Sequence, residues 1–401
     1  MSGPAAGTAA AATTTDVVCL GESMVTFLPS QPGRLADVPS FGRGIGGAES
    51  NVACALAAAG HRAAWVGRVG ADGFGDHLVE TIASYGVDTS AVRRDAARPT
   101  GIYFRTAADR GTGTHEVAYY RAGSAASAMS PDNVPHADVF AGRVLHLSGI
   151  TAALSADCLA LLRELTAARP GRPLVSFDVN HRPHLWHGSA ADASVLLELA
   201  RRADLVFVGE DEAEEAWGIV GAEAIRAALP EPSVVVVKRG SAGATVFSRT
   251  GPGPGPGSAE AGGAGEATGA PGAASGAGSG TGTETGSGTG AVTGSGTGAG
   301  SDTVTPVPAL RVDVVAAVGA GDAFAAGFLS ATLRGLPVRD RARHGHLMAA
   351  AVLTVPGDLT EPPARDHADR LVALDDDAWG RLRLAPGWTA ADRAPEEVRT
   401  P

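Results

Sequence analysis

The chain has few of the residues that mark disulfide-rich, metal-binding, membrane or nucleic-acid-binding proteins. Its 401 residues include three cysteines, and aromatic residues make up 5% of the sequence. Cys19, Cys54 and Cys158 form no C-x-x-C pair, which argues against a disulfide framework or zinc site and favours a reducing, cytoplasmic setting. No apolar run approaches the length of about 20 residues that a membrane-spanning helix needs. The formal net charge of −11, without a dense Lys/Arg block, argues against a nucleic-acid partner.

Two segments lack the apolar side chains that a folded core needs. Residues 1–15, "MSGPAAGTAAAATTT", have no basic stretch and no continuous apolar core, so they predict a disordered tail and no signal peptide. Residues 250–302 hold 20 of the 55 glycines and no aromatic residue, which predicts a disordered insertion. Strand-like "GATVFSR" and "TVTPVPALRVDVV" flank it, so we expect a swollen hairpin turn inside one domain that spans 16–400.

The rest of the chain alternates short apolar runs with Ala/Leu-rich helical patterns. Strands are predicted for "DVVCL" from Asp16, "RVLHLS" from Arg143, "LVSFDV" from Leu174, "LVFVG" from Leu205 and "SVVVVKR" from Ser233, and helices for "DCLALLRELTAAR" and "ASVLLELARRA". This order predicts an α/β fold with a mostly parallel sheet, helices on both faces, and ligands at the carboxyl ends of the strands. The more polar stretches 33–44 and 100–121 predict a small β-sheet that covers the site as a lid.

A glycine-rich turn with one acid occurs in "VVAAVGAGDAFAAGF". Asp322 follows Gly319, Ala320 and Gly321 and precedes an apolar helical pattern. One interpretation makes Asp322 a helix cap. The other makes the turn a phosphate site and the carboxylate a proton acceptor. This stretch alone does not decide between them.

A second glycine-rich stretch, "GIGGAESNVACALAAAG", begins at Gly44. Gly46 and Gly47 allow a ligand to approach the backbone closely, and Asn51 follows at the start of a predicted helix. A simple strand–turn–helix junction is the alternative interpretation.

Together these stretches resemble the two signatures of the ribokinase-like, or phosphofructokinase-B-type (PfkB), carbohydrate kinases. "GGAESNVACALAAAG" with "VGRVGADGFGDHLVETIASYGVDTSAV" resembles the first signature, and "GAGDAFAAGF" resembles the core of the second. The resemblance covers Asp16 to Leu374 apart from the glycine-rich insertion. It implies a ribokinase-like three-layer fold and transfer of the γ-phosphoryl group of ATP, with Mg²⁺, to a sugar hydroxyl.

The resemblance also implies roles for the second signature. Asp322 would be the catalytic base, and the N–H groups of Gly319, Ala320 and Gly321 would form the anion hole for the transferred phosphate. "VGEDEAEEAWG" lies where the family carries N-x-x-E. Gly209 takes the place of the asparagine, and Glu212 would be a magnesium ligand or, alternatively, part of a solvated acidic helix start.

Lys238 and Gly240, in "VVVVKRGSAGATVF", match the strand and turn beside the nucleotide. They would lie near the phosphates of ATP, and an exposed strand end is the alternative interpretation.

Four further stretches resemble the 2-keto-3-deoxygluconate kinases within this family: "GESMVTFLPS", "PTGIYFR", "AYYRAGSAASAMSP" and "SFDVNHRPHLW". The resemblance implies that Arg121 and Arg182 bind the substrate carboxylate, because a guanidinium matches a carboxylate with two hydrogen bonds. Tyr103 and Tyr119 would contact the sugar, and Gly46, Gly47 and Asn51 would complete its site. Core packing is the alternative for the tyrosines, and an ion pair with Asp178 is the alternative for Arg182.

The chain departs from the family where Asp-Thr usually precedes the glycine turn, because Ala316 and Ala317 stand there. We therefore expect K⁺ activation to be weak or absent, with Asp313 as a possible substitute ligand. His181 and His184 suggest no metal site, and His346 receives no role.

Two alternatives to a sugar-acid kinase stay open. One is a fructokinase or other neutral-sugar kinase, which we expect to leave Arg121 and Arg182 without a partner. The other is a sugar-binding homologue that has lost catalysis. A homo-oligomer is expected for either kinase.

Overall fold

The computed structural model describes residues 15–106, 116–186, 192–249 and 302–390. Nearly all of the predicted tail and insertion therefore lie outside the described residues. Over the described residues, no helix is long and apolar enough to cross a membrane.

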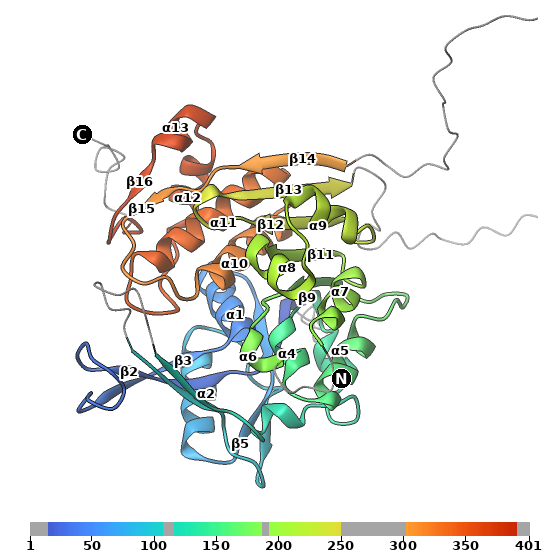
Figure 1. Ribbon diagram of the computed structural model, residues 1–401, viewed down its shortest axis with the longest axis vertical. Coiled ribbons are helices and arrows are strands. Elements are labelled where there is room, and N and C mark those ends of the chain that lie inside the picture. The colour runs from blue at the N-terminus through green and yellow to red at the C-terminus, as the bar shows by residue number, and fades with distance from the viewer. Residues whose placement is uncertain (1–14, 107–115, 187–191, 250–301, 391–401) are drawn as a thin grey trace, which may run out of the picture. The chain divides into compact units, whose positions relative to one another are not determined.

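The main element is an eight-stranded sheet with the order β14-β13-β12-β11-β10-β9-β1-β4 (Figure 1). Its strands are β1 (Thr15–Leu20), β4 (Ala63–Val66), β9 (Gly142–Ser148), β10 (Leu174–Asp178), β11 (Leu205–Gly209), β12 (Val234–Lys238), β13 (Ala244–Arg249) and β14 (Asp302–Val307). The strands from β4 to β12 pair in parallel, and β12 pairs antiparallel with β13. All five strands predicted for the parallel part are confirmed. β13 and β14, which flank the predicted insertion, are neighbours in the sheet.

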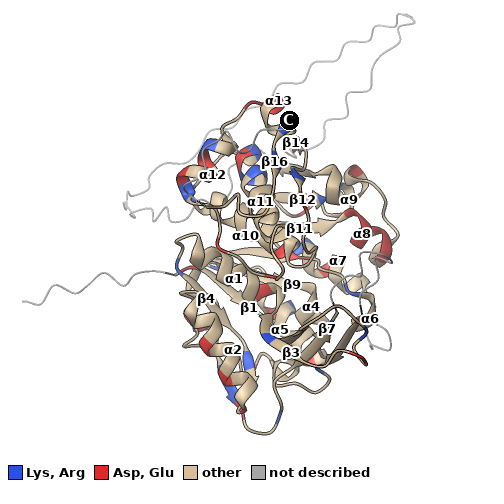
Figure 2. Cartoon of the chain, turned by 90° about the vertical axis from the view of Figure 1, so that its left-hand side faces the viewer, with Lys and Arg blue, Asp and Glu red and all other residues tan. Residues whose placement is uncertain are grey.

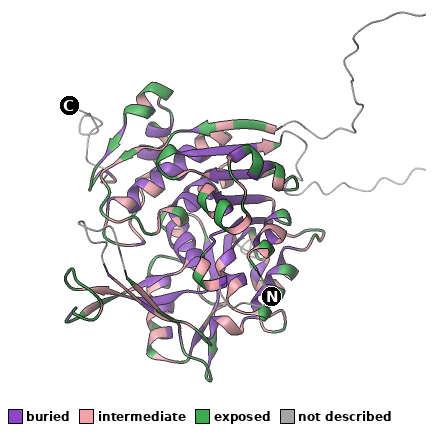
Figure 3. Cartoon of the chain, viewed as in Figure 1, coloured by how far each residue is buried: buried purple, intermediate pink, exposed green. Residues whose placement is uncertain are grey.

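Alternate side chains of the central strands enter two hydrophobic clusters, one on each face of the sheet. On β11, Val206 and Val208 join one cluster while Leu205 and Phe207 join the other. This alternation follows from the two-residue period of a strand and makes both faces apolar. Figure 3 shows the resulting band of buried strands.

Helices cover both faces, as the sequence predicts. The first cluster includes residues of α4 (Gly149–Ala153), α5 (Ala156–Leu165), α7 (Ser194–Arg201), α8 (Glu210–Trp217) and α9 (Ala222–Ala228). The second includes residues of α1 (Ala48–Ala58), α2 (Gly73–Ser84), α10 (Ala320–Leu333) and α11 (Val338–Leu353). A third cluster packs α11 against α12 (Arg365–Val372) and α13 (Asp376–Arg381). Two short helices, α3 (His136–Val139) and α6 (Pro183–Trp186), lie in the connections.

A separate four-stranded sheet has the order β3-β2-β7-β8 (Figure 1). It consists of β2 (Met24–Pro29), β3 (Phe41–Gly46), β7 (Ile102–Arg105) and β8 (Val117–Tyr120). The predicted small sheet is confirmed, but the prediction from 33–44 and 100–121 missed β2. β2 is central because it pairs with both β3 and β7.

Two short ribbons complete the described fold. β5 (Arg68–Gly70) pairs with β6 (Arg93–Asp95), and β15 (Arg311–Val312) pairs with β16 (Arg383–Leu384).

Candidate active site

The turn before α10 has the geometry of an anion site. Gly319 has a φ of 77° and is the N-cap of α10, which starts at Ala320. A side chain at Gly319 would clash, since a Cβ there would lie 2.7 Å from the carbonyl oxygen of Asp358. The first N–H groups of a helix have no partner within the helix, so those of Ala320 and Gly321 can bind an anion.

Asp322 is the third residue of α10 and makes no side-chain cap at its start. The interpretation of Asp322 as the N-cap residue is therefore wrong, because Gly319 occupies that position. The carboxylate instead accepts a hydrogen bond from Asn51, with 2.8 Å between Nδ2 and Oδ2. Asn51 lies on α1, so the two glycine-rich stretches meet at this pair.

The surroundings of Asp322 favour a neutral carboxyl group. Desolvation by the surrounding protein raises the pKa of Asp322 to about 7, and the charges of Asp178 and Asp358 act in the same direction. The hydrogen bond from Asn51 and the charge of Arg182 lower the pKa of Asp322 and limit the shift. A carboxylate with a pKa near neutrality is well suited to accept a proton.

Lys238 brings a positive charge to the start of α10. A Cβ built at Gly321 would lie 3.7 Å from its Nζ atom. Both oxygens of Asp178 accept hydrogen bonds from this ammonium at 3.0 Å. Desolvation lowers the pKa of Lys238, but the charges of Asp178, Glu212 and Asp322 outweigh it and raise the pKa overall. Lys238 is therefore no exposed strand end, whereas Gly240 lies exposed in the turn between β12 and β13.

Glu212 belongs to the acidic N-terminus of α8 (Figure 2). Its Oε2 atom accepts the N–H of Gly209 at 2.8 Å and thereby caps the helix. Its Oε1 atom lies 3.6 Å from Nη1 of Arg182. Glu212 thus belongs to an acidic helix start but is only 16% exposed, and its role as a magnesium ligand stays a prediction. The alternative for Arg182 is wrong, because Asp178 pairs with Lys238.

Arg121 forms a buried ion pair with Glu22, a residue that the sequence analysis did not select. The two side chains are 10% and 1% exposed. Ser124 donates a second hydrogen bond to Glu22, with 2.7 Å between Oγ and Oε1. The expectation that a neutral sugar would leave both arginines unpaired is therefore wrong, because Glu22 and Glu212 already face them. The Nε atom of Arg121 is buried and has no hydrogen-bond partner among the described residues.

The tyrosines lie on the small sheet. Tyr103 is buried, and its hydroxyl lies 3.4 Å from Oδ2 of Asp358. Tyr119 is 40% exposed and lies with its ring centroid 5.4 Å from that of Tyr103 and 5.0 Å from that of His184. The core-packing alternative therefore holds only in part, because the hydroxyl of Tyr103 points inward to a carboxylate.

Gly46 and Gly47 are packed so tightly that no side chain fits. A Cβ at Gly46 would lie 2.3 Å from the hydroxyl of Tyr103, and one at Gly47 would lie 2.4 Å from the carbonyl oxygen of Glu22. The strand–turn–helix alternative thus accounts for both glycines, and their contact with sugar stays a prediction.

Sequence reasoning missed several polar residues that the structure places at this site. They are Glu22, Arg105, Asn180 and Asp358, while Asp178 was named only as a partner for Arg182. Asp178 and Asn180 had a usable signal, since Asp178 is the last residue of the buried parallel strand β10 and Asn180 follows it. Asn180 has a φ of 41°, and its buried Oδ1 atom has no hydrogen-bond partner among the described residues.

Three other predictions concern positions beside the site. Asp313 pairs with Arg383 at 2.7 Å, and its role as a substitute for the missing Asp-Thr stays a prediction. His346 packs edge-on against Phe324, and burial lowers its pKa to about 4. No group of three or more metal-binding side chains occurs over the described part of the chain, His181 and His184 included.

The sequence pattern of the pfkB family carbohydrate kinases matches residues 14–265 and 285–365. The chain belongs to this family. It is 32% identical to 2-dehydro-3-deoxygluconokinase of Bacillus subtilis (strain 168) over 88% of this chain and 93% of that protein. It is 31% identical to fructokinase-1 of Zea mays over 58% and 73% of the two chains. A fructokinase from Xylella fastidiosa with bound ATP is similar in fold, with a TM-score of 0.66, 22% identity, and coverage of 90% and 98%. The chain is therefore a carbohydrate kinase of ribokinase-like fold.

Proposed function

We propose that this kinase phosphorylates 2-keto-3-deoxygluconate (2-dehydro-3-deoxygluconate) to its 6-phosphate, with ATP and Mg²⁺. The observation that carries the phosphoryl-transfer part is the arrangement around α10. It combines the N–H groups of Ala320 and Gly321 in the first turn of the helix, the ammonium of Lys238, and a carboxyl group at Asp322 whose pKa is about 7. The similarity to the Bacillus subtilis kinase over nearly both full lengths supports the choice of sugar.

In the proposed reaction, Asp322 accepts the proton of the sugar hydroxyl while the oxygen of that hydroxyl bonds to the γ-phosphorus of ATP. The bond from that phosphorus to the bridging oxygen breaks, and ADP leaves with the electron pair. The N–H groups at the start of α10 and the ammonium of Lys238 stabilise the negative charge of the transferred group.

The oxygen atoms at the site fit a magnesium ion, which would neutralise charge on the phosphates of ATP. Mg²⁺ prefers oxygen ligands and usually keeps several waters. Oε1 of Glu212 is not used by the helix cap, and Oδ1 of Asn180 is buried without a hydrogen-bond partner among the described residues. These two atoms, with the carboxylate of Asp178, are our proposed source of direct or water-mediated contacts.

We propose that the base of the nucleotide packs on an apolar surface next to the anion site. Val314, Val315 and Val318, which lie within the five residues before Gly319, are 58%, 49% and 39% exposed. Exposed apolar side chains beside a polar site are typical of a ligand surface.

We propose that the substrate carboxylate binds Arg121 and Arg182. Arg121 has a buried Nε donor without a partner among the described residues, and a carboxylate would satisfy it. The hydroxyl groups of the sugar would contact Asn51, Tyr103, Tyr119 and the backbone at Gly46 and Gly47.

A coupled ADP-release assay tests the proposal across 2-keto-3-deoxygluconate, its galactonate epimer, fructose and ribose. We expect the highest kcat/KM for 2-keto-3-deoxygluconate or its epimer. A preference for fructose would contradict the sugar-acid assignment. A fructokinase is the second candidate, and it is favoured by the carboxylate partners that Arg121 and Arg182 already have. Absence of turnover with every sugar would contradict an active kinase.

A further inference from the structure

Asp358 lies at a junction of three parts of the site. It belongs to the connection between α11 and α12 and is buried. Its Oδ1 atom accepts a hydrogen bond from Arg105 at 2.6 Å, and the two side chains are 6% and 11% exposed. Its Oδ2 atom faces the hydroxyl of Tyr103. Both partners lie on β7, so the carboxylate of Asp358 is joined to the small sheet.

The main chain of the same residue contacts the anion-binding turn. The Cα and carbonyl oxygen of Asp358 would lie 3.0 and 2.7 Å from a Cβ at Gly319. Gly319 starts the helix that carries Asp322. Asp358 also lines the same small pocket as Asn51, which donates a hydrogen bond to Asp322.

We propose that Asp358 is a positioning residue that couples the small sheet to the anion-binding turn. The ion pair with Arg105 holds Asp358 in place, and the backbone of Asp358 in turn fixes Gly319 and the start of α10. A displacement of β7 therefore misplaces the N–H groups and the carboxylate that act on the transferred phosphate. The proposal rests on the proposed phosphoryl transfer, but it does not depend on which sugar is the acceptor.

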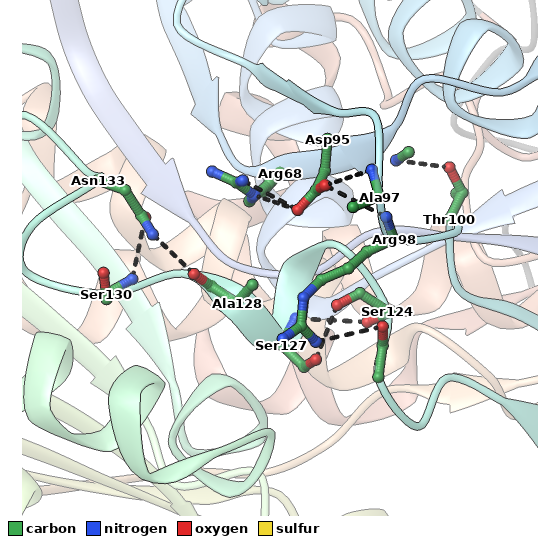
Figure 4. Close-up of polar contacts among 12 residues, drawn as sticks. Arg68, Asp95, Ala97, Arg98, Thr100, Ser124, Ser127, Ala128, Ser130 and Asn133 are labelled. Atoms are coloured by element: carbon green, nitrogen blue, oxygen red, sulfur yellow. Dashed lines mark hydrogen bonds and ion pairs between the residues drawn. The ribbon is translucent and has the colours of Figure 1, made fainter.

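If the ion pair between Arg105 and Asp358 contributed only to stability, we would expect a different result. Loss of one partner would then lower the melting temperature without acting selectively at α10. The molecule offers a matched control in the pair between Arg68 of β5 and Asp95 of β6, at 2.9 Å with side chains 23% and 9% exposed. Figure 4 shows that Asp95 also accepts the N–H groups of Ala97 and Arg98, so it ties a loop to a ribbon in a similar way.

The decisive variant is Arg105→Gln, because the ion pair of Arg105 is with Asp358 and not with a residue of α10. Hydrogen exchange of the full chain is compared in peptides that cover 102–105 and 319–323, together with kcat and KM for the accepted sugar. We expect faster exchange in both peptides and a fall in kcat of about 10- to 100-fold, the size expected from misplaced reacting groups. Arg105→Lys, which keeps the charge, should recover part of both effects.

Asp95→Asn should lower the melting temperature while leaving kcat and the exchange of 319–323 unchanged. Asp358→Asn should reproduce the faster exchange of Arg105→Gln in both peptides. The proposal is overturned if Arg105→Gln accelerates exchange in 102–105 alone, or if its kcat loss equals that of Asp95→Asn. Hydrogen exchange needs no substrate, so a wrong sugar assignment in the ADP-release assay leaves this test intact.

Discussion

Replacement of Asp322 by asparagine removes the proposed proton acceptor while the shape of the side chain is kept. We expect kcat to fall by about 10²–10⁴-fold, the usual effect of losing a general base. ATP binding, measured by calorimetry, should be nearly unchanged because the N–H groups of α10 and Lys238 remain. A variant with activity close to the wild type would contradict the assignment of Asp322 as the base.

The pH dependence of kcat/KM gives a second measurement on the same residue. Desolvation raises the pKa of Asp322 to about 7, and only the deprotonated carboxylate can accept a proton. Activity should therefore rise with pH, by up to about tenfold per pH unit below this pKa, and level off above it. Asn51→Ala removes a hydrogen bond that lowers the pKa of Asp322, so the rise should move to higher pH. An unchanged profile in this variant would contradict the assignment.

Arg121→Ala tests whether Arg121 binds the carboxylate of the sugar acid. We expect KM for the acid sugar to rise far more than KM for fructose, with a loss of roughly 1.5–3 kcal/mol for one charge-assisted contact. The variant leaves Glu22 buried without its partner, so Arg121→Ala with Glu22→Gln serves as a control for damage to the fold. Melting temperatures of both variants are measured alongside. Equal losses for acid and neutral sugars would argue against an acid-sugar site.

At the scale of the elements, the sequence predicted those strands whose position follows from their own composition. The strands of the parallel sheet are apolar on both faces, so their composition identified them. β2 was missed because "MVTFLP" becomes a strand of the small sheet through its pairing with β3 and β7. Glu22 was missed for the same reason, since its partner Arg121 is 99 residues away and nothing local marks the pair. Asn51 and Asp322 were each noted in a glycine-rich stretch, but nothing local marks the contact between them across 271 residues.

The turn before α10 supports a prediction on cation dependence. Ala316 and Ala317 offer neither charge nor hydroxyl where the resemblance leads us to expect Asp-Thr, and Asp313 is held by Arg383. We expect turnover with little or no activation by potassium. Ala316→Asp with Ala317→Thr should raise kcat and confer potassium dependence. Initial rates are measured against potassium at fixed sodium and ionic strength. Strong potassium activation of the unaltered chain would show that its cation site uses other residues.

At the scale of the whole molecule, the layered α/β architecture was predictable because each layer has its own sequence period. The contact between the small sheet and Asp358 was not predictable, because Asp358 lies in a loop between α11 and α12 that has no strong sequence pattern. Arg105, Tyr103 and Gly46 come together with Asp358 only when the sheet and the loop are both in place.

The last prediction also concerns the whole molecule and tests the role of the predicted insertion. Residues 251–300 lie outside the described residues, but β13 and β14 on either side are neighbours in the central sheet. Replacing 251–300 by a short turn therefore keeps the pairing of these strands, and a long loop adds little closure free energy, with each doubling of its length costing only about 0.6 kcal/mol. We expect the melting temperature to stay the same or rise slightly and kcat/KM to be unchanged, as measured by differential scanning calorimetry and the ADP-release assay. A large fall in kcat with an intact melting transition would assign the insertion a part in catalysis, because the sheet itself would still be folded.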